Sequence, residues 1–316
     1  MLRYFARRLV MLVPVLFGVS VLVFSMIRLI PGDIVDSMLG QEAASPAVYA
    51  QMRATFGLDR PMYVQYIQWI GGVLRGDFGV SLRSGQPIVG SILSALPVTA
   101  ELALVTLVLS CSIAIPLGVI SGLKRNSWTD LLVRTTGLLG ISLPNFWLAT
   151  LFILIASVGF GWLPALIFVS PFQDLRVNLS QIIMPSVVLA TGLSAITMRQ
   201  TRSAVLDVVR RDYVRTAQAK GLREQTVIVR HVLKNALIPV ITVVGLQVGF
   251  LLSGTVIIEQ ILGIPGMGWL LLNAINRRDY PVVQAVTLLL AVFFVTANLI
   301  VDILYAVVDP RIRYVK

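Results

Sequence analysis

The 316-residue chain has one cysteine, one histidine and few charged residues, which make up 13% of it. A single cysteine cannot form an intrachain disulfide, and Cys111 stands in an apolar run, so we expect a small buried side chain and not a reactive thiol. His231 has no serine, cysteine or metal-ligand motif beside it, which favours a helix-surface role over a catalytic base or a pH switch. The sequence therefore predicts a protein that is not an enzyme and holds no metal.

A loop that binds nucleotide phosphates is missing as well. The pattern G-x-x-x-x-G-K-[ST] does not occur, and no glycine is followed by lysine. The glycine-rich stretch GIPGMG at 263–268 does not have the order G-x-G-x-x-G, and no strand pattern precedes it, so we expect a tight re-entrant or external loop there. No cofactor is predicted on this chain.

Apolar residues are abundant instead: they make up 57% of the chain, and the mean hydropathy is +0.86. Six apolar runs lie at 9–30, 99–122, 134–160, 180–198, 237–262 and 281–307. Each run is long enough to span a membrane if it is helical, since roughly 20 helical residues cross about 30 Å of hydrocarbon, and none alternates as barrel strands do. The first run is longer than the apolar part of a signal peptide, so we interpret it as a retained anchor. The sequence predicts an all-α transmembrane protein with six spans.

The distribution of charge predicts the orientation of these spans. The net charge is +11, and with six spans both termini share one side, on which 18 of the 26 basic residues fall. This excess predicts a cytoplasmic location for 1–8, 124–134, 199–234 and the tail at 308–316. The basic residues are split among loops and carry no recognition motif, so no nucleic acid partner is expected.

The segment 31–98, between the first two spans, is predicted to be a helical insertion on the extracytoplasmic side. Ser45 and Pro46 predict the start of a helix that Gly57 stops, and a second helix is expected from Pro61 to Gly71 or Gly76. The second helix has an apolar face of Tyr63, Tyr66, Ile67, Ile70, Val73 and Leu74. This face can lie on the membrane surface or against the transmembrane helices. We favour the helices, because the opposite face has no excess of Lys or Arg.

Several features inside or beside the spans have a structural and a functional interpretation. The acidic residues Glu101, Glu259 and Asp302 fall near span ends, which favours interfacial placement or helix packing over a proton or ion relay. Glycines four apart, in GVISG at 118–122 and GLQVG at 245–249, favour close helix packing over a gate. Pro14, Pro116 and Pro144 can kink the helices that contain or follow them. The stretch GDFGVSL at 76–82 is interpreted as a structural turn.

The cytoplasmic segment DYVRTAQAKGLREQTVIVRHVLKNALIP, at 212–239, interrupts the apolar runs. Asp212 is predicted to cap a helix from Tyr213 to Lys220, with Gly221 at the position after its C-cap. A second helix is predicted with an apolar stripe of Val229, Val232, Leu233, Ala236 and Leu237. The small residues Ala217 and Ala219 are expected on an outward face that a partner groove could accept.

This segment resembles the EAA loop of permease subunits of ATP-binding cassette importers. Against the general pattern E-A-A-x3-G-x9-I-x-L-P, only Ala217, Gly221 and Leu233 match, but the segment is similar to the variant of dipeptide and oligopeptide permeases. The resemblance extends along the chain through RLVMLVPVLFGVSVLVF, PGD, GLDRP, GDFGVS, RRDYPVVQA and VDILYAVVDPRIRY.

The resemblance implies a six-span type I importer permease that transports dipeptides, oligopeptides or related solutes such as glutathione or nickel. It implies a second homologous permease subunit, two cytoplasmic ATPase subunits that bind ATP and Mg, and an extracytoplasmic solute-binding protein. It also implies that the loop at 206–236 is a coupling helix that docks in a groove of the ATPase. Its residues carried over are Asp212, Tyr213, Arg215, Thr216, Ala217, Ala219, Lys220, Gly221, Leu222, His231 and Asn235.

Two alternatives remain, an ATP-independent secondary transporter and a channel. A secondary transporter would predict acids near the membrane midplane and inverted repeats, and a channel would present a filter motif. The sequence has no such acids, repeat or filter motif, so the importer permease is favoured.

Overall fold

The computed structural model describes residues 2–29, 35, 46–55, 57–161 and 167–308. The chain divides into two compact units: Met1–Pro97 with Pro265–Phe293, and Val98–Ile264 with Phe294–Lys316. Among the described residues the regular structure is helical apart from one isolated bridge between Val80 and Pro87, so the predicted all-α class is confirmed.

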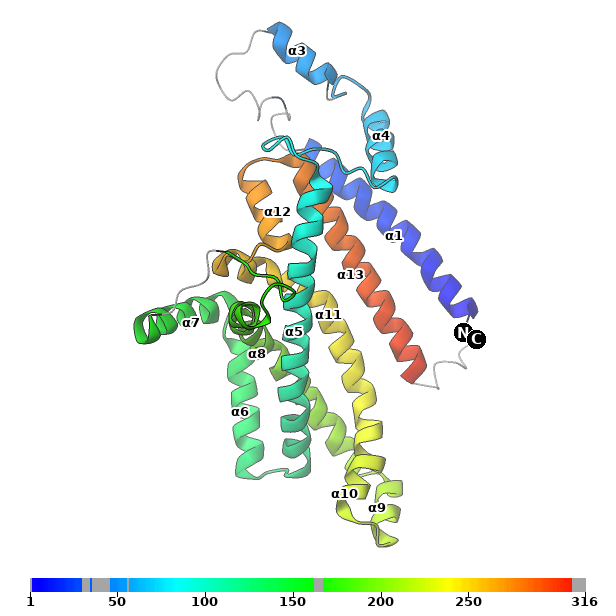
Figure 1. Ribbon diagram of the computed structural model, residues 1–316. Coiled ribbons are helices and arrows are strands. Elements are labelled where there is room, and N and C mark those ends of the chain that lie inside the picture. The colour runs from blue at the N-terminus through cyan, green and yellow to red at the C-terminus, as the bar shows by residue number, and fades with distance from the viewer. Residues whose placement is uncertain (1, 30–34, 36–45, 56, 162–166, 309–316) are drawn as a thin grey trace. The chain divides into compact units, whose positions relative to one another are not determined.

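The first unit contains α1 (Leu2–Arg28), α3 (Pro46–Thr55), α4 (Met62–Leu74) and α12 (Met267–Asn276), with the first parts of α5 (Ile88–Leu123) and α13 (Tyr280–Val308). Figure 1 shows α12 folded beside the start of α5. The buried core of this unit comes from three helices and consists of Ile88, Ile92, Ala95, Met267, Ala274, Val282, Ala285 and Val286. Segments that are far apart in the sequence, 88–95 and 267–286, therefore share one core.

In the described part of the insertion at 31–98, the helices lie where they were predicted, but their packing differs from the prediction. Helix α3 begins at Pro46, and Ser45 lies outside the described residues; Gly57 follows with a φ of 65°. Helix α4 begins after Pro61 and ends before Gly76, as predicted. Of the predicted apolar face, Tyr66 contacts α1, whereas Tyr63, Ile67 and Leu74 are exposed. The expectation that this whole face packs against helices is wrong for these three side chains.

The stretch Gly76–Leu82 forms a turn, as predicted, and it is fixed by a residue far along the chain. The Gly79 amide donates to Asp77 Oδ1 at 2.9 Å. The Ser81 hydroxyl donates to Asp279 Oδ2 at 2.5 Å, and the Leu82 amide donates to Asp279 Oδ1 at 3.1 Å. Asp279 is buried, so its carboxylate joins the turn to the start of α13.

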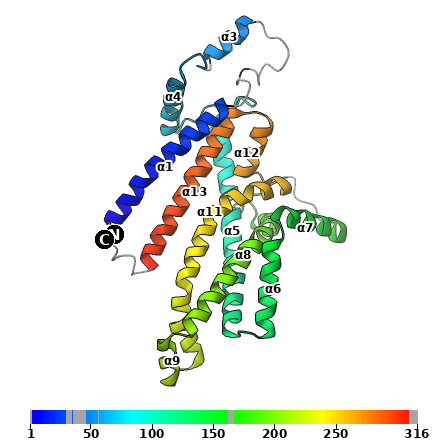
Figure 2. The same ribbon diagram turned by 180° about the vertical axis from the view of Figure 1, so that it is seen from behind.

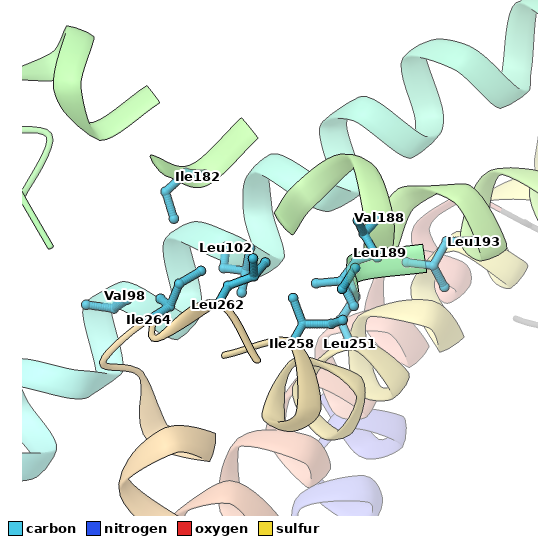
Figure 3. Packing of buried hydrophobic residues seen from close by; sticks show 11 residues of the cluster. Val98, Leu102, Ile182, Val188, Leu189, Leu193, Leu251, Ile258, Leu262 and Ile264 are labelled. Carbon is cyan, nitrogen blue, oxygen red and sulfur yellow. The ribbon is translucent and has the colours of Figure 1, made fainter. Parts of the chain in front are cut away.

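The second unit contains most of α5, then α6 (Trp128–Ser142), α7 (Asn145–Phe160), α8 (Leu175–Val209), α9 (Asp212–Ala219), α10 (Glu224–Thr226), the π-helix η1 (Val227–Leu233), α11 (Lys234–Leu262) and the end of α13. Its larger core lies between α5, α7, α8 and α11 (Figure 3). The core residues are Val98, Leu102, Ala149, Ile182, Val188, Leu189, Leu193, Leu251, Ile258, Leu262 and Ile264.

Close packing at the predicted glycine pairs is confirmed. A Cβ added at Gly118 would lie 2.6 Å from Thr201 Cβ, and one at Gly122 would lie 2.8 Å from Val205 Cβ, so α5 and α8 approach through these glycines. Cβ atoms at Gly245 and Gly249 would likewise meet the side chains of Val301 and Phe294 on α13. Both glycine pairs act as small-residue contact faces.

Four helical segments of the described chain are long and apolar enough to cross a membrane: Ile88–Leu123, Leu175–Val209, Glu224–Leu251 and Tyr280–Val301. The number rises to six if each of two bent helix pairs is one span, and α1 contributes a shorter apolar stretch, Val10–Met26. The second span starts at Ile88, earlier than the run predicted at 99.

The run predicted at 134–160 is not one straight helix. Helices α6 and α7 meet at 99°. Leu143 has an extended backbone, with φ −92° and ψ 125°, because the residue before a proline is driven out of the helical region. Pro144 therefore separates two helices where one was expected.

Of the three acidic residues in the spans, Glu259 has a defined packing role. Its side chain is fully buried, and its Oε1 accepts a hydrogen bond from the Thr99 hydroxyl at 2.7 Å, which links α11 to α5. Glu101 is half-buried, and the side chain of Asp302 lies outside the described part of the chain.

Candidate functional site

The predicted cytoplasmic hairpin is present, but its first helix starts differently. The residue at the N-cap of α9 is Arg211, with φ −72° and ψ 143°, and no side chain caps the helix. Asp212 is the first helical residue, so the predicted capping role of Asp212 is wrong. Its carboxylate still lies at the positive end of the helix dipole, where an acidic group is favourable.

The end of α9 agrees with the prediction. Gly221 has a φ of 75°, its amide donates to the Gln218 carbonyl at 2.9 Å, and the Leu222 amide donates to the Ala217 carbonyl at 3.4 Å. These two bonds form a Schellman motif, in which the residue after the C-cap is left-handed and is usually glycine. A Cβ at Gly221 would meet nothing within 4 Å, so the backbone conformation alone requires glycine.

The second helix is a π-helix, and this changes which residues face inward. The predicted stripe is wrong at Val229, which is 61% exposed. The buried residues are Val227 and Val232 in η1, followed by Ala236 and Val240 in α11. In a π-helix the hydrogen bonds join residues five apart, so Val227 and Val232 share a face that an α-helical pattern does not predict.

A small core holds α9 against its flanking helices. Val214 and Ala217 of α9 are buried with residues of α8, η1 and α11; the buried set is Ala204, Val205, Val214, Ala217, Val227, Val232, Ala236 and Val240. Ala217 is only 5% exposed, so the expectation that it faces a partner groove is wrong. The hairpin is therefore packed onto the stems of α8 and α11.

The other predicted loop residues lie mostly on the surface. Asp212, Tyr213, Arg215, Thr216, Ala219, Lys220, Gly221, Leu222 and Asn235 are exposed, and His231 is half-buried. The Asn235 amide nitrogen donates to the His231 carbonyl at 2.9 Å, and the Tyr213 hydroxyl lies 3.5 Å from the same oxygen. The hairpin surface is mainly basic, with exposed Arg210, Arg211, Arg215, Lys220, Arg223, Arg230 and Lys234 against Asp207, Asp212 and Glu224.

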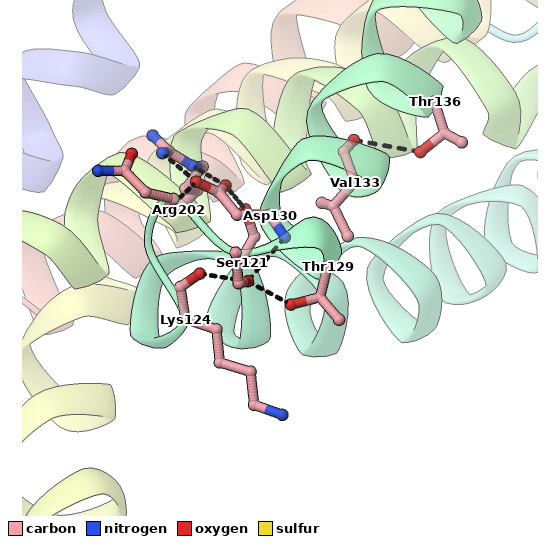
Figure 4. Close-up of polar contacts among 9 residues, drawn as sticks. Ser121, Lys124, Thr129, Asp130, Val133, Thr136 and Arg202 are labelled. Carbon is pink, nitrogen blue, oxygen red and sulfur yellow. Dashed lines mark hydrogen bonds and ion pairs between the residues drawn. The ribbon is translucent and has the colours of Figure 1, made fainter.

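A buried ion pair near the hairpin was not predicted. The Asp130 carboxylate, with no exposed surface, accepts from Arg202 Nε at 2.7 Å and Nη2 at 2.8 Å (Figure 4). It also accepts from the Ser121 hydroxyl at 2.6 Å and the Asn126 amide at 2.9 Å. This carboxylate joins α5, α6 and α8. The S-x-x-D pattern at Ser127 is a signal for the start of α6 that was not used in the prediction, and nothing in this pattern indicates Arg202, 72 residues later.

A second buried contact was also missed, between the two helices that lead to the hairpin. The Thr197 hydroxyl of α8 donates to Gln247 Oε1 of α11 at 3.1 Å, and Gln247 Nε2 donates to the Leu193 carbonyl at 3.1 Å. Both side chains are buried. Helices α8 and α11 are thus tied by an amide group whose oxygen and nitrogen are both hydrogen-bonded.

Within the described residues, no group of three or more His, Cys, Asp or Glu side chains is placed to hold a metal ion. The arrangement contains packed helices, buried polar ties and an exposed basic hairpin. It defines a class of protein: an all-α integral membrane protein with an exposed basic hairpin between two of its long apolar helices.

The chain belongs to the family of binding-protein-dependent transport system inner membrane components. Residues 114–314 match the model of this family, and residues 1–103 match the model of its N-terminal region. The chain is 43% identical to the di/tripeptide transport system permease protein DppB of Pseudomonas aeruginosa, over 99% of each chain. It is 41% identical to the oligopeptide transport system permease protein AppB of Bacillus subtilis, over 99% of this chain and 100% of the relative.

A third relative has a different solute in its name. The glutathione transport system permease protein GsiC of Escherichia coli (strain K12) is 40% identical, over 99% of this chain and 100% of the relative. Among solved structures, the chain resembles the crystal structure of an amino acid ABC transporter with histidines, with a TM-score of 0.50 and 14% identity over 68% of this chain and 93% of that one. This last likeness concerns the fold alone.

Proposed function

We propose that this chain is a transmembrane permease subunit of an ATP-binding cassette importer and that it forms, with a second homologous permease, the path for di- or oligopeptides or related solutes such as glutathione. The support is its membership of the inner membrane component family and its full-length similarity to permeases named for dipeptides, oligopeptides and glutathione. The particular solute is left open, because these relatives differ in it.

The other subunits supply what this chain lacks. Two cytoplasmic ATPase subunits bind ATP and Mg and hydrolyse the nucleotide, and an extracytoplasmic binding protein delivers the solute. This chain is not an enzyme and holds no cofactor. In this proposal 31–98 lies outside a bacterial inner membrane, whereas both termini and the loop at 206–236 lie in the cytoplasm.

The packed hairpin is the observation that carries the proposed coupling. Val214 and Ala217 are buried against α8, η1 and α11, so a force on α9 acts on both flanking helices. The exposed Tyr213 and Leu222, among basic side chains, offer a surface for the ATPase groove. Closure of the two ATPases would then shift the permease between inward-open and outward-open populations.

Uptake by the reconstituted complex tests the proposal. Vesicles that contain this chain, its partner permease, both ATPases and the binding protein should accumulate a labelled dipeptide or glutathione only when ATP is supplied. The control is a complex with an ATPase that cannot hydrolyse ATP. Uptake driven equally well in vesicles with this chain alone would contradict the proposal and favour a secondary transporter or channel.

A further inference from the structure

We propose that α4 lies in the membrane interface on the side of the insertion and that the face formed by Tyr63, Ile67 and Leu74 contacts phospholipid. This inference concerns the placement of one helix in the bilayer. It does not depend on which solute is transported or on the hairpin at 206–236.

Helix α4 lacks the basic face of a typical interfacial anchor, so the case for lipid rests on its exposed apolar side chains and on its ends. Its 13 residues, MYVQYIQWIGGVL, include no Asp, Glu, Lys or Arg, and none of them is buried within the protein. Tyr63, Ile67 and Leu74 share one side of the helix and are between 62% and 81% exposed. A contiguous apolar face of this kind marks a site that a protein or a membrane covers.

The contacts of Tyr66 fix where α4 lies along α1. The Tyr66 hydroxyl is 2.8 Å from the Ser20 hydroxyl, and the Tyr66 ring packs edge-on against Phe24 with centroids 5.3 Å apart. Ser20 precedes the end of α1 at Arg28 by eight positions, which corresponds to about 12 Å along a helix. It belongs to the apolar stretch Val10–Met26. Helix α4 therefore contacts α1 within its apolar stretch, and Figures 1 and 2 both show α4 next to α1.

Polar groups between α1 and α4 are paired within the protein. Arg28 donates from Nη2 and Nε to Gln65 Oε1 at 3.0 and 3.3 Å, and its guanidinium lies 4.0 Å from the centre of the Phe24 ring. Gln65 Nε2 donates in turn to the Arg60 carbonyl at 2.8 Å. Because the Arg28 and Gln65 side chains have hydrogen-bond partners in the protein, the side of α4 that faces α1 can lie away from bulk water.

The ends of α4 favour the interface over the centre of the bilayer. Arg60 precedes the helix and Arg75 follows it, and both side chains are exposed. Tyr63 and Trp69 have amphipathic rings of the kind that gathers at the level of the lipid headgroups. Arginines at both ends can reach phosphate groups, while the apolar face enters about 5–10 Å below the headgroup boundary. Depth, composition and end charges together favour lipid over a protein partner.

Spin-label accessibility tests this placement in the full chain. Cys111→Ala removes the native thiol, and single substitutions Ile67→Cys and Leu74→Cys then place a nitroxide on the outward face, with Tyr63→Cys as a further position if either variant assembles poorly. Asp59→Cys is the control in the loop before the helix, and Val108→Cys is the reference on an exposed apolar position of α5. The samples are reconstituted in phosphatidylethanolamine–phosphatidylglycerol bilayers. Collision rates are measured with oxygen, which partitions into lipid, and with a water-soluble nickel chelate.

The measured quantity is the ratio of the collision rate with oxygen to that with the nickel chelate. This ratio should be several-fold higher for the labels at 67 and 74 than for the label at 59, and it should approach the ratio for the label at 108. A ratio at 67 and 74 equal to that at 59 would place the face in water and overturn the proposal. Shielding of both labels from both reagents would overturn it as well, since protein would then cover the face.

Discussion

The guanidinium of Arg202 donates two hydrogen bonds, at 2.7 and 2.8 Å, to the fully buried carboxylate of Asp130. The same carboxylate accepts from Ser121, so α5, α6 and α8 meet at one buried charge. Because α8 leads into the hairpin, any movement of its stem acts on α5 and α6 through this pair. A charge in this position is costly to leave unpaired.

Replacing Arg202 with methionine should lower the free energy of unfolding by about 3 kcal/mol, because the Asp130 carboxylate then stays buried without its partner. Denaturant unfolding of the purified chain in detergent micelles measures this loss. Arg199→Met is the matched control: Arg199 is exposed on the same helix, and we expect a change within about 0.5 kcal/mol.

The double variant Asp130→Leu/Arg202→Met separates the ion pair from simple packing. Removing both charges should recover most of the loss, because a buried pair replaced by apolar side chains of similar size is often nearly neutral. A double variant as unstable as Arg202→Met would contradict this explanation.

Gly221→Val should abolish uptake by the assembled transporter while membrane insertion stays unchanged. The φ of 75° at this position costs a residue with a Cβ about 1–2 kcal/mol, and β-branching adds to it, so the Schellman turn distorts. Gly221→Asn should be milder, since asparagine tolerates the left-handed region. Uptake and membrane content are measured together, and unchanged uptake in Gly221→Val would count against the coupling role.

Ala217→Leu and Ala219→Leu should act on different properties. Ala217 is buried in the small core, so added volume should lower the free energy of unfolding by about 1–3 kcal/mol. Ala219 is exposed two residues later, so its variant should stay stable yet bind the partner ATPase more weakly, which a pull-down of the solubilised complex can measure. If Ala219→Leu assembles normally and couples fully, the ATPase contacts another part of the hairpin.

The tie between Thr197 and Gln247 should show a coupling energy in a double-mutant cycle with Thr197→Val and Gln247→Leu. Hydrogen bonds between membrane helices average about 0.6 kcal/mol and reach about 1.7 kcal/mol, and this pair should fall at the upper end, because Gln247 also donates to the Leu193 carbonyl. Unfolding of the four proteins supplies the cycle. Additive effects of the two substitutions would show that the side chains act independently.

The purified chain alone should neither bind nor hydrolyse ATP. The pattern G-x-x-x-x-G-K-[ST] does not occur in its sequence, and in the proposed function the nucleotide is bound and hydrolysed by the ATPase subunits. Equilibrium dialysis with labelled ATP and a phosphate-release assay check both parts, with the complete complex as positive control. Robust hydrolysis by the isolated chain would rule out the proposed division of labour.

Local features of the fold were predictable from the sequence because they depend on neighbouring residues. The left-handed turn at Gly221, the start of α4 after Pro61 and the helix approach at Gly118 all follow from glycine and proline geometry. The bend between α6 and α7 was predicted only in part, because a proline within an apolar run can either kink a helix or divide it into two. Here it divides the run.

Features that depend on distant residues could not be predicted in this way. The pattern around Asp130 carries no information about Arg202, and that around Asp279 carries none about Ser81. The inward face of η1 was missed because periodicity analysis assumes 3.6 residues per turn, whereas a π-helix brings Val227 and Val232 to one side. Ala217 was wrongly assigned to the outside because a small residue fits both a partner groove and a tight core, and the sequence does not distinguish the two.

The bond from Ser81 to Asp279 also has a consequence for biosynthesis. The two residues are 198 positions apart, so the ribosome releases the acceptor long after the donor. At a rate of roughly 5–20 residues per second, the delay is roughly 10–40 s. During this interval the amino-terminal part of the chain waits in the membrane without the core residues that α12 and α13 contribute. A nascent chain arrested before residue 279 should therefore be especially sensitive to the quality-control proteases of the cell.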